Sequence, residues 1–286
     1  MATILKAKEA AERIYDDVRS RAQALKATGI QPQLDVILVE GDPASAYYAQ
    51  AKRKIADRLG IAYRLHELPA DATEASLLQL IAECNAVPAV HGILLELPLP
   101  AHLSARRIER AIAPAKDVDG VSPANKLAVV TGEPGLYPAT PQACIALVKH
   151  YGYALEGADV TLIGRGQTVG LPLFHLLQRE QATVTVCHSR TPDIAKHLAR
   201  AAFAFVAVGR PDTVTPSMIH PGLVLADAGI NELADGSIAG DVAAGAGELA
   251  AAYSPVPGGV GTLTTAIVFR NLMEAIDWQQ KEATVE

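Results

Sequence analysis

The stretch DVTLIGRGQTVGLPLFHLLQR, residues 159–179, decides the fold. An apolar run typical of a buried strand (159–163) leads into a glycine-rich turn, which leads into a predicted helix over 168–179. In this setting the backbone can approach a pyrophosphate, because the helix N-terminus offers unpaired N–H groups and a partial positive charge. The spacing is GxGxxxG, one residue longer than the usual dinucleotide fingerprint. The turn alone is therefore equally compatible with a plain strand-to-helix connection.

The end of the next predicted strand, 183–187, narrows the choice of ligand. Many dinucleotide-binding folds place Asp or Glu there to bind the adenosine ribose. This chain instead has His188, Ser189 and Arg190 after Cys187. Together with Arg165, Ser189 and Arg190 offer charge and a hydroxyl to a 2′-phosphate, which favours NADP over NAD. The alternative is a solvated loop, which the strand-end position disfavours.

Strands and helices alternate along most of the remaining chain. In the N-terminal half, three predicted strands each precede a helix, which indicates a parallel sheet covered by helices. The predicted strands there are 34–40, 61–65 and 90–97, and the helices are 44–59, 74–85 and 104–113. An irregular, Pro- and Gly-rich stretch follows over 114–141. After it, the predicted elements are a helix at 142–151, strands at 204–208 and 223–226, and a final helix at 263–281. A second irregular stretch, 240–261, precedes this final helix.

This pattern predicts an α/β protein of two lobes. The first, 1–138, is a three-layer-like α/β lobe, and the second, 139–262, is a Rossmann-type lobe. A ligand is expected in a cleft between the lobes, at the C-terminal ends of strands.

Composition excludes several classes of protein. The 286 residues carry a net charge of −6 without a basic block, which argues against nucleic acid and against a basic membrane-surface helix. No apolar run reaches the roughly 18 residues that span a bilayer, and the charged residues 1–12 do not resemble a signal peptide. The three cysteines and eight histidines have no metal-ligand spacing, so we expect no metal, reduced thiols in the core and a cytoplasmic location.

The helix predicted over 44–59 carries the second motif. Ser45, Tyr48 and Lys52 share one helix face, whereas Lys54 points about 200° away from Lys52. A Tyr and a Lys on one face can stack a planar ligand and move a proton. The alternative is a surface Lys beside a core Tyr.

Two acids and a glycine loop complete the candidates. Glu96 lies near the end of an apolar strand, where a buried carboxylate needs a partner; an exposed strand-end Glu is an equal alternative. Asp119 either accepts hydrogen bonds from a ligand or only forms a turn before Gly120. The loop 255–261, PVPGGVG, offers bare N–H groups at a helix start to a cofactor, or simply caps that helix.

These stretches together resemble the bifunctional methylenetetrahydrofolate dehydrogenase/cyclohydrolase family, the bacterial FolD type. The resemblance rests on SxxYxxxKxK, GILxxLPLP, KDVDG, PxTP, GRxxxVGxP, TVTxCHS, the Gly-Ile-Asn and Gly-Asp-Val segments at 229–231 and 240–242, and PVPGGVG, in family order over nearly the whole chain. It implies oxidation of 5,10-methylenetetrahydrofolate with NADP to the 5,10-methenyl compound, then hydrolysis to 10-formyltetrahydrofolate. It also implies a homodimer working in one-carbon metabolism and purine biosynthesis, and a final helix (263–286) that returns to the first lobe.

The resemblance assigns roles by position. Lys52 is the expected acid/base, with Tyr48 stacking on the pterin and Glu96 beside Lys52. The expected folate-binding residues are Tyr48, Asp119, Pro257, Gly258 and Gly259. The expected NADP-binding residues are Gly164, Arg165, Gly166, Val169, Gly170, His188, Ser189, Arg190, Thr140, Gly209 and Ile230.

Four positions depart from the family pattern. The family usually has Gln at Glu96, Ser at Gly166, Cys at Ala139 and Pro at Thr262; Thr262 is expected to cap the last helix. Glu96 adds a charge beside Lys52, so the hydrolytic activity is expected to be weakened and the chain is a candidate specialised paralogue. Two alternatives stay open: an NADP oxidoreductase with another substrate, and a non-catalytic folate- or NADP-binding protein.

Overall fold

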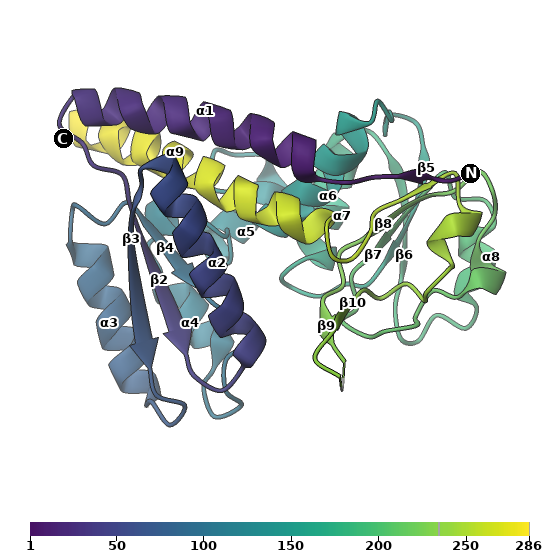
Figure 1. Cartoon of the computed structure of the whole chain (residues 1–286), viewed down its shortest axis with the longest axis horizontal. Coiled ribbons are helices and arrows are strands. Elements are labelled where there is room, and N and C mark those ends of the chain that lie inside the picture. The colour runs from purple at the N-terminus through teal and green to yellow at the C-terminus, as the bar shows by residue number, and fades with distance from the viewer. Residues whose placement is uncertain (234, 286) are drawn as a thin grey trace. The chain divides into compact units, whose positions relative to one another are not determined.

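The computed structural model describes residues 1–233 and 235–285 and contains two compact units, traced in Figure 1. Unit 1 comprises Met1–Arg13 and Ala139–Ile267, and unit 2 comprises Ile14–Pro138 and Val268–Glu286. The chain therefore passes from one unit to the other three times. No helix among the described residues is long and apolar enough to cross a membrane.

Unit 2 is built on a three-stranded parallel sheet of order β3-β2-β4. Parallel neighbours require crossover connections, and helices supply them here. The elements are β2 (Gln33–Val39), α2 (Pro43–Leu59), β3 (Ala62–Leu68), α3 (Glu74–Ala86), β4 (Gly92–Leu95), α4 (Ala105–Ala111), the 3₁₀ turn η1 (Pro114–Lys116) and α5 (Pro123–Thr131), with most of α1 (Lys8–Ala27) and of α9 (Val260–Val285).

The two faces of this sheet are covered by different helices. Ile37 and Val39 of β2 pack in one apolar cluster with Ile81 of α3 and Ile108 of α4. On the other face, Tyr63 of β3 bonds to the backbone of α2, and a Cβ on Gly92 would touch Leu272 of α9.

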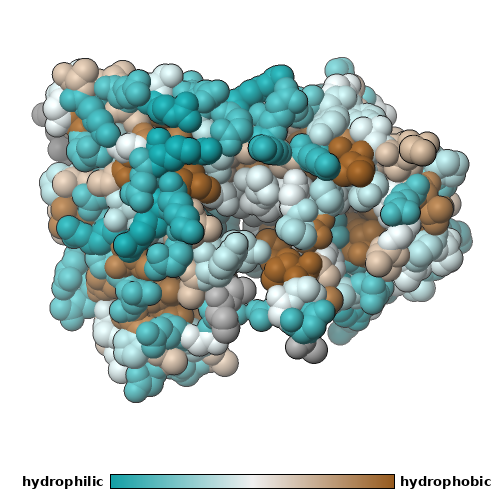
Figure 2. Space-filling view, in the orientation of Figure 1, coloured by the Kyte–Doolittle hydropathy of each residue, from teal (hydrophilic) through white to brown (hydrophobic). Residues whose placement is uncertain are grey.

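Helices α1 and α9 run side by side within unit 2 (Figure 1). The rings of Tyr15 and Phe269 meet edge to face at 6.4 Å, and Arg21 pairs with Asp277 at 2.7 Å. Hydrophilic side chains cover the outer side of α1 in Figure 2. Helix α9 thus supplies core residues to a unit whose other elements lie more than a hundred residues earlier.

Unit 1 contains a six-stranded parallel sheet of order β1-β11-β8-β7-β5-β6. Strand β6 lies on one side of β5 and β7 on the other, so the winding reverses at β5, where Rossmann-type sheets bind nucleotides. The elements are β1 (Thr3–Ile4), α6 (Ala139–His150), β5 (Asp159–Ile163), α7 (Gly170–Arg179), β6 (Thr183–Cys187), α8 (Ile194–Leu198), β7 (Phe203–Val206), η2 (Pro216–Met218), β8 (Val224–Asp227), the hairpin β9 (Asn231–Glu232) and β10 (Ile238–Ala239), η3 (Gly247–Leu249) and β11 (Ala252–Tyr253).

The predicted α/β fold with parallel sheets and two domains is confirmed, but four local expectations are wrong. The stretch 114–141 is not irregular throughout, because α5 lies in it, capped by Ser122 and ended by Gly132 in the left-handed region. The stretch 240–261 contains β11. Thr262 does not cap the last helix, because α9 already begins at Val260. Residues 1–13 group with residues 139–267, because β1 pairs with β11, a contact that the expected lobe 1–138 did not include.

Candidate active site

The start of α2 is fixed by a local cap. The Asp42 carboxylate accepts the Ser45 N–H at 3.0 Å and also the Ser45 hydroxyl. The same hydroxyl lies 3.2 Å from the Leu97 carbonyl, in the segment just after β4. Ser45 therefore joins the first turn of α2 to the segment that follows Glu96.

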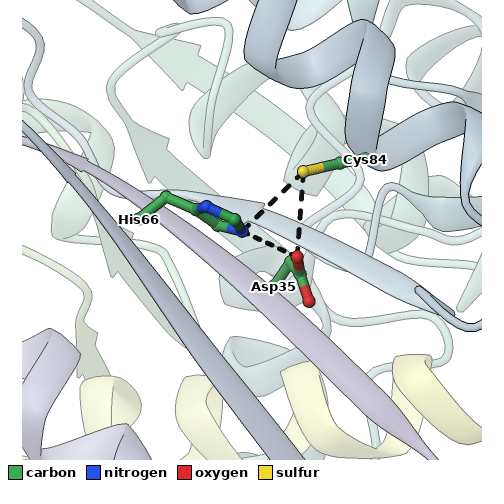
Figure 3. Close-up of side chains that lie close together, drawn as sticks. All are labelled: Asp35, His66 and Cys84. Carbon is green, nitrogen blue, oxygen red and sulfur yellow. Dashed lines mark hydrogen bonds and ion pairs between the residues drawn. The ribbon is translucent and has the colours of Figure 1, made fainter.

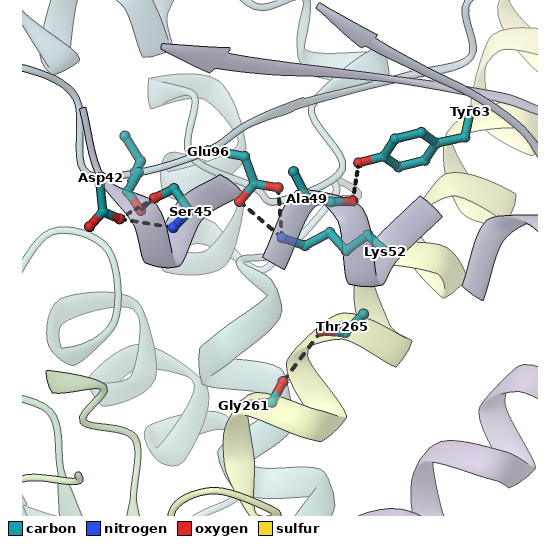
Figure 4. Close-up of polar contacts among 9 residues, drawn as sticks. Asp42, Ser45, Ala49, Lys52, Tyr63, Glu96, Gly261 and Thr265 are labelled. Carbon is teal, nitrogen blue, oxygen red and sulfur yellow. Dashed lines mark hydrogen bonds and ion pairs between the residues drawn. The ribbon is translucent and has the colours of Figure 1, made fainter. Parts of the chain in front are cut away.

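Lys52 and Glu96 form a buried ion pair, drawn in Figure 4. The Lys52 ammonium donates to both Glu96 oxygens, at 2.7 and 2.9 Å. Only 13% of the lysine side chain and 8% of the glutamate side chain are exposed. The Glu96 N–H donates to the Ile37 carbonyl at 2.9 Å, which extends the β4–β2 pairing by one residue. The alternative of an exposed strand-end Glu is therefore wrong.

Tyr48 lies one helical turn before Lys52, on the predicted face. Its ring centroid is 6.0 Å from the Lys52 ammonium, and the pKa of its hydroxyl is raised, by burial first and by Tyr47 second. Lys54, predicted to point away from this face, is exposed. The face thus presents a neutral phenol ring beside a paired cation.

Tyr63 is a site residue that the sequence analysis missed. Its hydroxyl donates to the Ala49 carbonyl at 2.8 Å and so attaches the middle of α2 to β3. Burial raises the pKa of this phenol, and the negative charge of Glu96 raises it further. A tyrosine in a strand of mixed burial carries no sequence signal for this contact.

The motif KDVDG separates into structural residues and one candidate ligand-binding residue. The Lys116 ammonium donates to the carbonyls of Cys84, Asn85 and Val87, at 3.2, 2.8 and 2.8 Å. The buried Asp117 carboxylate accepts the N–H groups of Val121 and Ser122 and the Asn125 side chain. These two charged residues therefore build the loop.

Asp119 differs from Asp117 in its surroundings. It is partly exposed, and its carboxylate makes no hydrogen bond to any residue that the structure describes. Burial raises its pKa to about 7, the charges of Asp117 and Glu96 add to the rise, and Lys52 opposes it. A carboxyl group that titrates near neutrality and lies within electrostatic reach of Lys52 is suited to bind a ligand's N–H groups.

The glycine turn of unit 1 brings the ends of three strands together. Gly164 has φ +118°, and a Cβ there would overlap the Ala207 carbonyl after β7. Its N–H donates to the Cys187 carbonyl at 2.9 Å, at the end of β6. A Cβ on Gly170 would overlap the Gly164 carbonyl, so both glycines are required for close backbone approach. Helix α7 begins at Gly170, two residues later than predicted.

The exposed part of this turn follows β5, whose neighbouring strand β6 leads into residues 188–190. Arg165 and Gly166 are exposed, Val169 is partly exposed, and no atom lies within 4 Å of a Cβ built on Gly166. Because Ile163 pairs with Cys187, Arg165 and Ser189 each lie two residues beyond paired strand ends.

The turn after Cys187 is fixed by its own side chains. The His188 N–H donates to Thr191 Oγ1 at 3.0 Å, and the Arg190 N–H donates to His188 Nδ1 at 3.2 Å. Ser189 and Arg190 are both exposed. Two of the three residues predicted to receive a 2′-phosphate thus lie on a turn with fixed backbone geometry.

Two buried aspartates fix the loops after β7 and β8, a role that the sequence analysis did not assign. The Asp241 carboxylate accepts the N–H groups of Val208, Gly209 and Arg210, at 2.6, 3.0 and 2.8 Å. The Asp227 carboxylate accepts the N–H groups of Gly229, Asp241 and Val242, and burial raises its pKa. Asp241 lies in the Gly-Asp-Val segment and Asp227 lies two residues before the Gly-Ile-Asn segment, and these motifs were the only available signal.

Ile230, one of the expected cofactor-binding residues, is 50% exposed on the loop that Asp227 and Asp241 shape. The remaining expected residues lie near the start of α6 and of α9. The Thr140 hydroxyl is 3.3 Å from the Thr264 hydroxyl. Gly258 has φ +103°, and its carbonyl accepts the Ala7 N–H at 2.9 Å, while Pro257 is exposed. A Cβ on Gly259 would meet the Pro255 carbonyl at 2.5 Å, so the loop before α9 is closely packed backbone.

Comparison with known proteins gives matches over nearly the whole chain. Residues 5–119 match the catalytic domain of the tetrahydrofolate dehydrogenase/cyclohydrolase family, and residues 138–280 match its NAD(P)-binding domain. The bifunctional protein FolD of Heliobacterium modesticaldum is 50% identical over 273 residues, 95% of each chain.

Two solved structures share this architecture. The bifunctional FolD methylenetetrahydrofolate dehydrogenase/cyclohydrolase of Campylobacter jejuni has a TM-score of 0.92 at 35% identity, over 98% of this chain and 100% of that one. The Trypanosoma brucei N5,N10-methylenetetrahydrofolate dehydrogenase-cyclohydrolase, complexed with NADP cofactor and an inhibitor, has a TM-score of 0.92 at 30% identity, over 97% and 98%.

Proposed function

Because the chain belongs to the tetrahydrofolate dehydrogenase/cyclohydrolase family, we propose that it oxidises 5,10-methylenetetrahydrofolate with NADP to 5,10-methenyltetrahydrofolate. We propose that it also hydrolyses this product to 10-formyltetrahydrofolate, at a reduced rate. The observation that carries the proposal is the buried Lys52–Glu96 pair beside Tyr48 and within electrostatic reach of Asp119.

The oxidation needs little from the protein beyond placement. Hydride loss from the N5–CH₂–N10 bridge to the nicotinamide leaves a delocalised, amidinium-like cation, and alignment of the reacting carbon supplies much of the rate. Tyr48 would stack on the pterin and aminobenzoyl rings, and Asp119 would accept hydrogen bonds from pterin N–H groups. Pro257, Gly258 and Gly259 would contact the folate from the loop before α9.

The cofactor would be held by residues of unit 1. Gly164, Gly166, Val169 and Gly170 would let the pyrophosphate approach the N-terminus of α7, a helix of ten residues. Arg165, Ser189 and Arg190 would receive the 2′-phosphate, since all three are exposed at neighbouring strand ends. His188, Thr140, Gly209 and Ile230 would complete the contacts.

The hydrolysis depends on the protonation of Lys52. Attack of water on the methenyl carbon requires a proton acceptor, and collapse of the adduct requires a donor; one lysine can serve for both. An opposite charge in contact favours the charged form of each partner. In this structure the Lys52 ammonium is engaged as a donor to both Glu96 oxygens, at 2.7 and 2.9 Å, and this engagement would weaken Lys52 as a base.

We further propose a homodimer that works in the cytoplasm, in the one-carbon metabolism that supplies purine biosynthesis. The three cysteines, all buried free thiols, accord with a reducing compartment. Gel filtration with light scattering tests the dimer.

The decisive experiment measures the two half-reactions separately. NADPH formation from 5,10-methylenetetrahydrofolate should be readily detected, and decay of 5,10-methenyltetrahydrofolate should be slow but enzyme-dependent. Lys52→Gln should remove the enzyme-dependent decay. Absence of NADPH formation despite folate binding would favour a non-catalytic binding protein instead.

A further inference from the structure

Three side chains of different metal-ligand types converge inside unit 2 (Figure 3). Asp35 comes from β2, His66 from β3 and Cys84 from α3. Asp35 Oδ2 lies 2.7 Å from His66 Nε2, and Cys84 Sγ lies 3.8 Å from that oxygen and 3.9 Å from that nitrogen. The group packs on the α3 side of the sheet, whereas α2, which carries Lys52, covers the opposite face. It is therefore separate from the site proposed above.

The geometry does not fit a Cys–His–Asp nucleophile. Such a triad uses one ring nitrogen of the histidine for the acid and the other for the nucleophile. Here the carboxylate and the thiol both approach the same nitrogen, Nε2. Burial and the neighbouring Asp35 also raise the pKa of the Cys84 thiol to about 11, so it is not activated as a nucleophile.

Three donor atoms facing a common point instead fit a tetrahedral metal ion. We propose that Asp35, His66 and Cys84 bind Zn²⁺, with a water molecule in the fourth position. Zn²⁺ takes this mixture of carboxylate oxygen, imidazole nitrogen and thiolate sulfur, at about 2.0–2.3 Å from each. Donor atoms 2.7–3.9 Å apart need to move by only fractions of an ångström to surround such an ion.

Charge and proton balance are satisfied. Binding forms a zinc–sulfur bond and releases the Cys84 thiol proton to solvent, while the His66 proton moves from Nε2 to Nδ1 so that Nε2 can coordinate. The Asp35 carboxylate and the Cys84 thiolate together neutralise the divalent charge in a buried place. The buried Lys116 lies close enough to interact with Asp35 and Cys84. Its positive charge would oppose the binding of a second cation, so two anionic ligands are required to offset it.

The ligands are held before any metal arrives. Gln33 Nε2 donates to Asp35 Oδ1 at 2.7 Å, which directs Oδ2 toward the other two ligands. Lys116 Nζ donates to the Cys84 carbonyl at 3.2 Å and so holds the end of α3. Such supporting bonds are typical of metal sites. The sequence expectation of no metal rested on spacing, but these ligands lie 31 and 18 residues apart, on three elements.

The test uses Co²⁺ as a spectroscopic substitute for Zn²⁺. The full-length chain, freed of any affinity tag, treated with chelator and kept reduced, is titrated with Co²⁺. We expect one equivalent to produce tetrahedral visible bands and a near-ultraviolet thiolate charge-transfer band, both removed by one equivalent of Zn²⁺. Cys84→Ser should remove the charge-transfer band and weaken Zn²⁺ binding at least tenfold. Cys187→Ser, a buried free cysteine in unit 1, should change neither.

A second variant protects the test against misfolding. His66 is partly exposed, so His66→Gln should fold even if Cys84→Ser does not, and it should lose the Zn²⁺-induced rise in Tm seen in the wild type. An octahedral spectrum without a thiolate band, or a band that persists in Cys84→Ser, would overturn the proposal. So would a wild-type Tm that Zn²⁺ does not raise.

Discussion

The Lys52 ammonium lies 2.7 and 2.9 Å from the two carboxylate oxygens of Glu96, and both side chains are nearly excluded from solvent. Truncating one partner of a buried pair leaves the other charge without a hydrogen-bond partner, whereas exchanging the acid for its amide keeps the shape of the side chain and one of the two acceptor oxygens. Glu96→Gln is thus the substitution that removes the negative charge at this site with the smallest change in side-chain shape.

Glu96→Gln should raise methenyltetrahydrofolate hydrolysis by roughly tenfold, a fraction of the roughly 10²–10⁴-fold that a positioned acid or base contributes, and change hydride transfer much less. Parallel assays of both half-reactions measure this. Glu74→Gln is the matched control, because Glu74 is paired with Arg107 elsewhere in the same unit. If Glu96→Gln abolished hydrolysis, Glu96 itself would be the base.

Folate binding should depend on pH through Asp119. Its pKa, raised by burial to about 7, makes the carboxyl group neutral below that pH and ionised above it. Only the ionised form accepts hydrogen bonds at both oxygens, so affinity for a folate ligand should fall about tenfold from pH 8 to pH 6, in proportion to the ionised fraction. Calorimetric titration at several pH values measures the fall.

The variant Asp119→Asn supplies the control for this dependence. It should bind folate more weakly at every pH, without the fall between pH 8 and pH 6, and its NADP affinity should be nearly unchanged. An equal collapse of NADP affinity would make Asp119 a structural residue.

Arg165→Ala should weaken NADP binding by about 1.5–3 kcal/mol, the range for a hydrogen bond to a charged group, and NAD binding far less. The comparison needs Kd values for both dinucleotides. Lys149→Ala, an exposed lysine of unit 1 paired with Glu180, is the control and should alter neither. Equal losses of affinity for NADP and NAD would show that Arg165 does not bind the 2′-phosphate.

The effect of a substitution in the glycine turn should depend on the free space around the glycine that is replaced. Gly166→Ser enters open space, so its effect on unfolding free energy should stay within about 0.5 kcal/mol, and its hydroxyl should strengthen NADP binding. Gly170→Ser would collide with the backbone of Gly164 and should cost about 2 kcal/mol or more. Denaturant unfolding of both variants measures the loss of stability, and NADP titration of Gly166→Ser measures the change in cofactor affinity.

The sequence predicted the regular elements well and the accessory ones poorly. Apolar runs and the Asp42-Pro43 cap located β2 and α2, because local patterns report local structure. Helix α5 escaped notice although Ser122-Pro123 and Gly132 mark its two ends, since the prolines and glycines around it suggested a loop. Strands of two residues, such as β1 and β11, have no periodicity to detect, and their partners lie far away in the chain.

The candidate site was predictable only where motif and helix geometry coincided. The helix period placed Tyr48 and Lys52 on one face, whereas the position of Glu96 beside Lys52 was implied only by the family resemblance. Tyr63, Asp227 and Asp241 act through contacts between distant segments, which no local pattern reports. Asp117 and Asp119 lie two residues apart but have different roles. The Asp117 carboxylate accepts hydrogen bonds from its own loop, whereas the Asp119 carboxylate does not and can bind a ligand.

Helix α9 also constrains the order of folding during synthesis. Phe269, Leu272 and Met273 are fully buried in unit 2, yet they are synthesised more than a hundred residues after α5, the preceding element of that unit. Unit 2 cannot complete its native core before α9 has been synthesised, so its earlier elements have to persist as an incomplete intermediate until then. A gene split between residues 138 and 139 would therefore yield two fragments, each lacking a strand or a helix that only the other encodes.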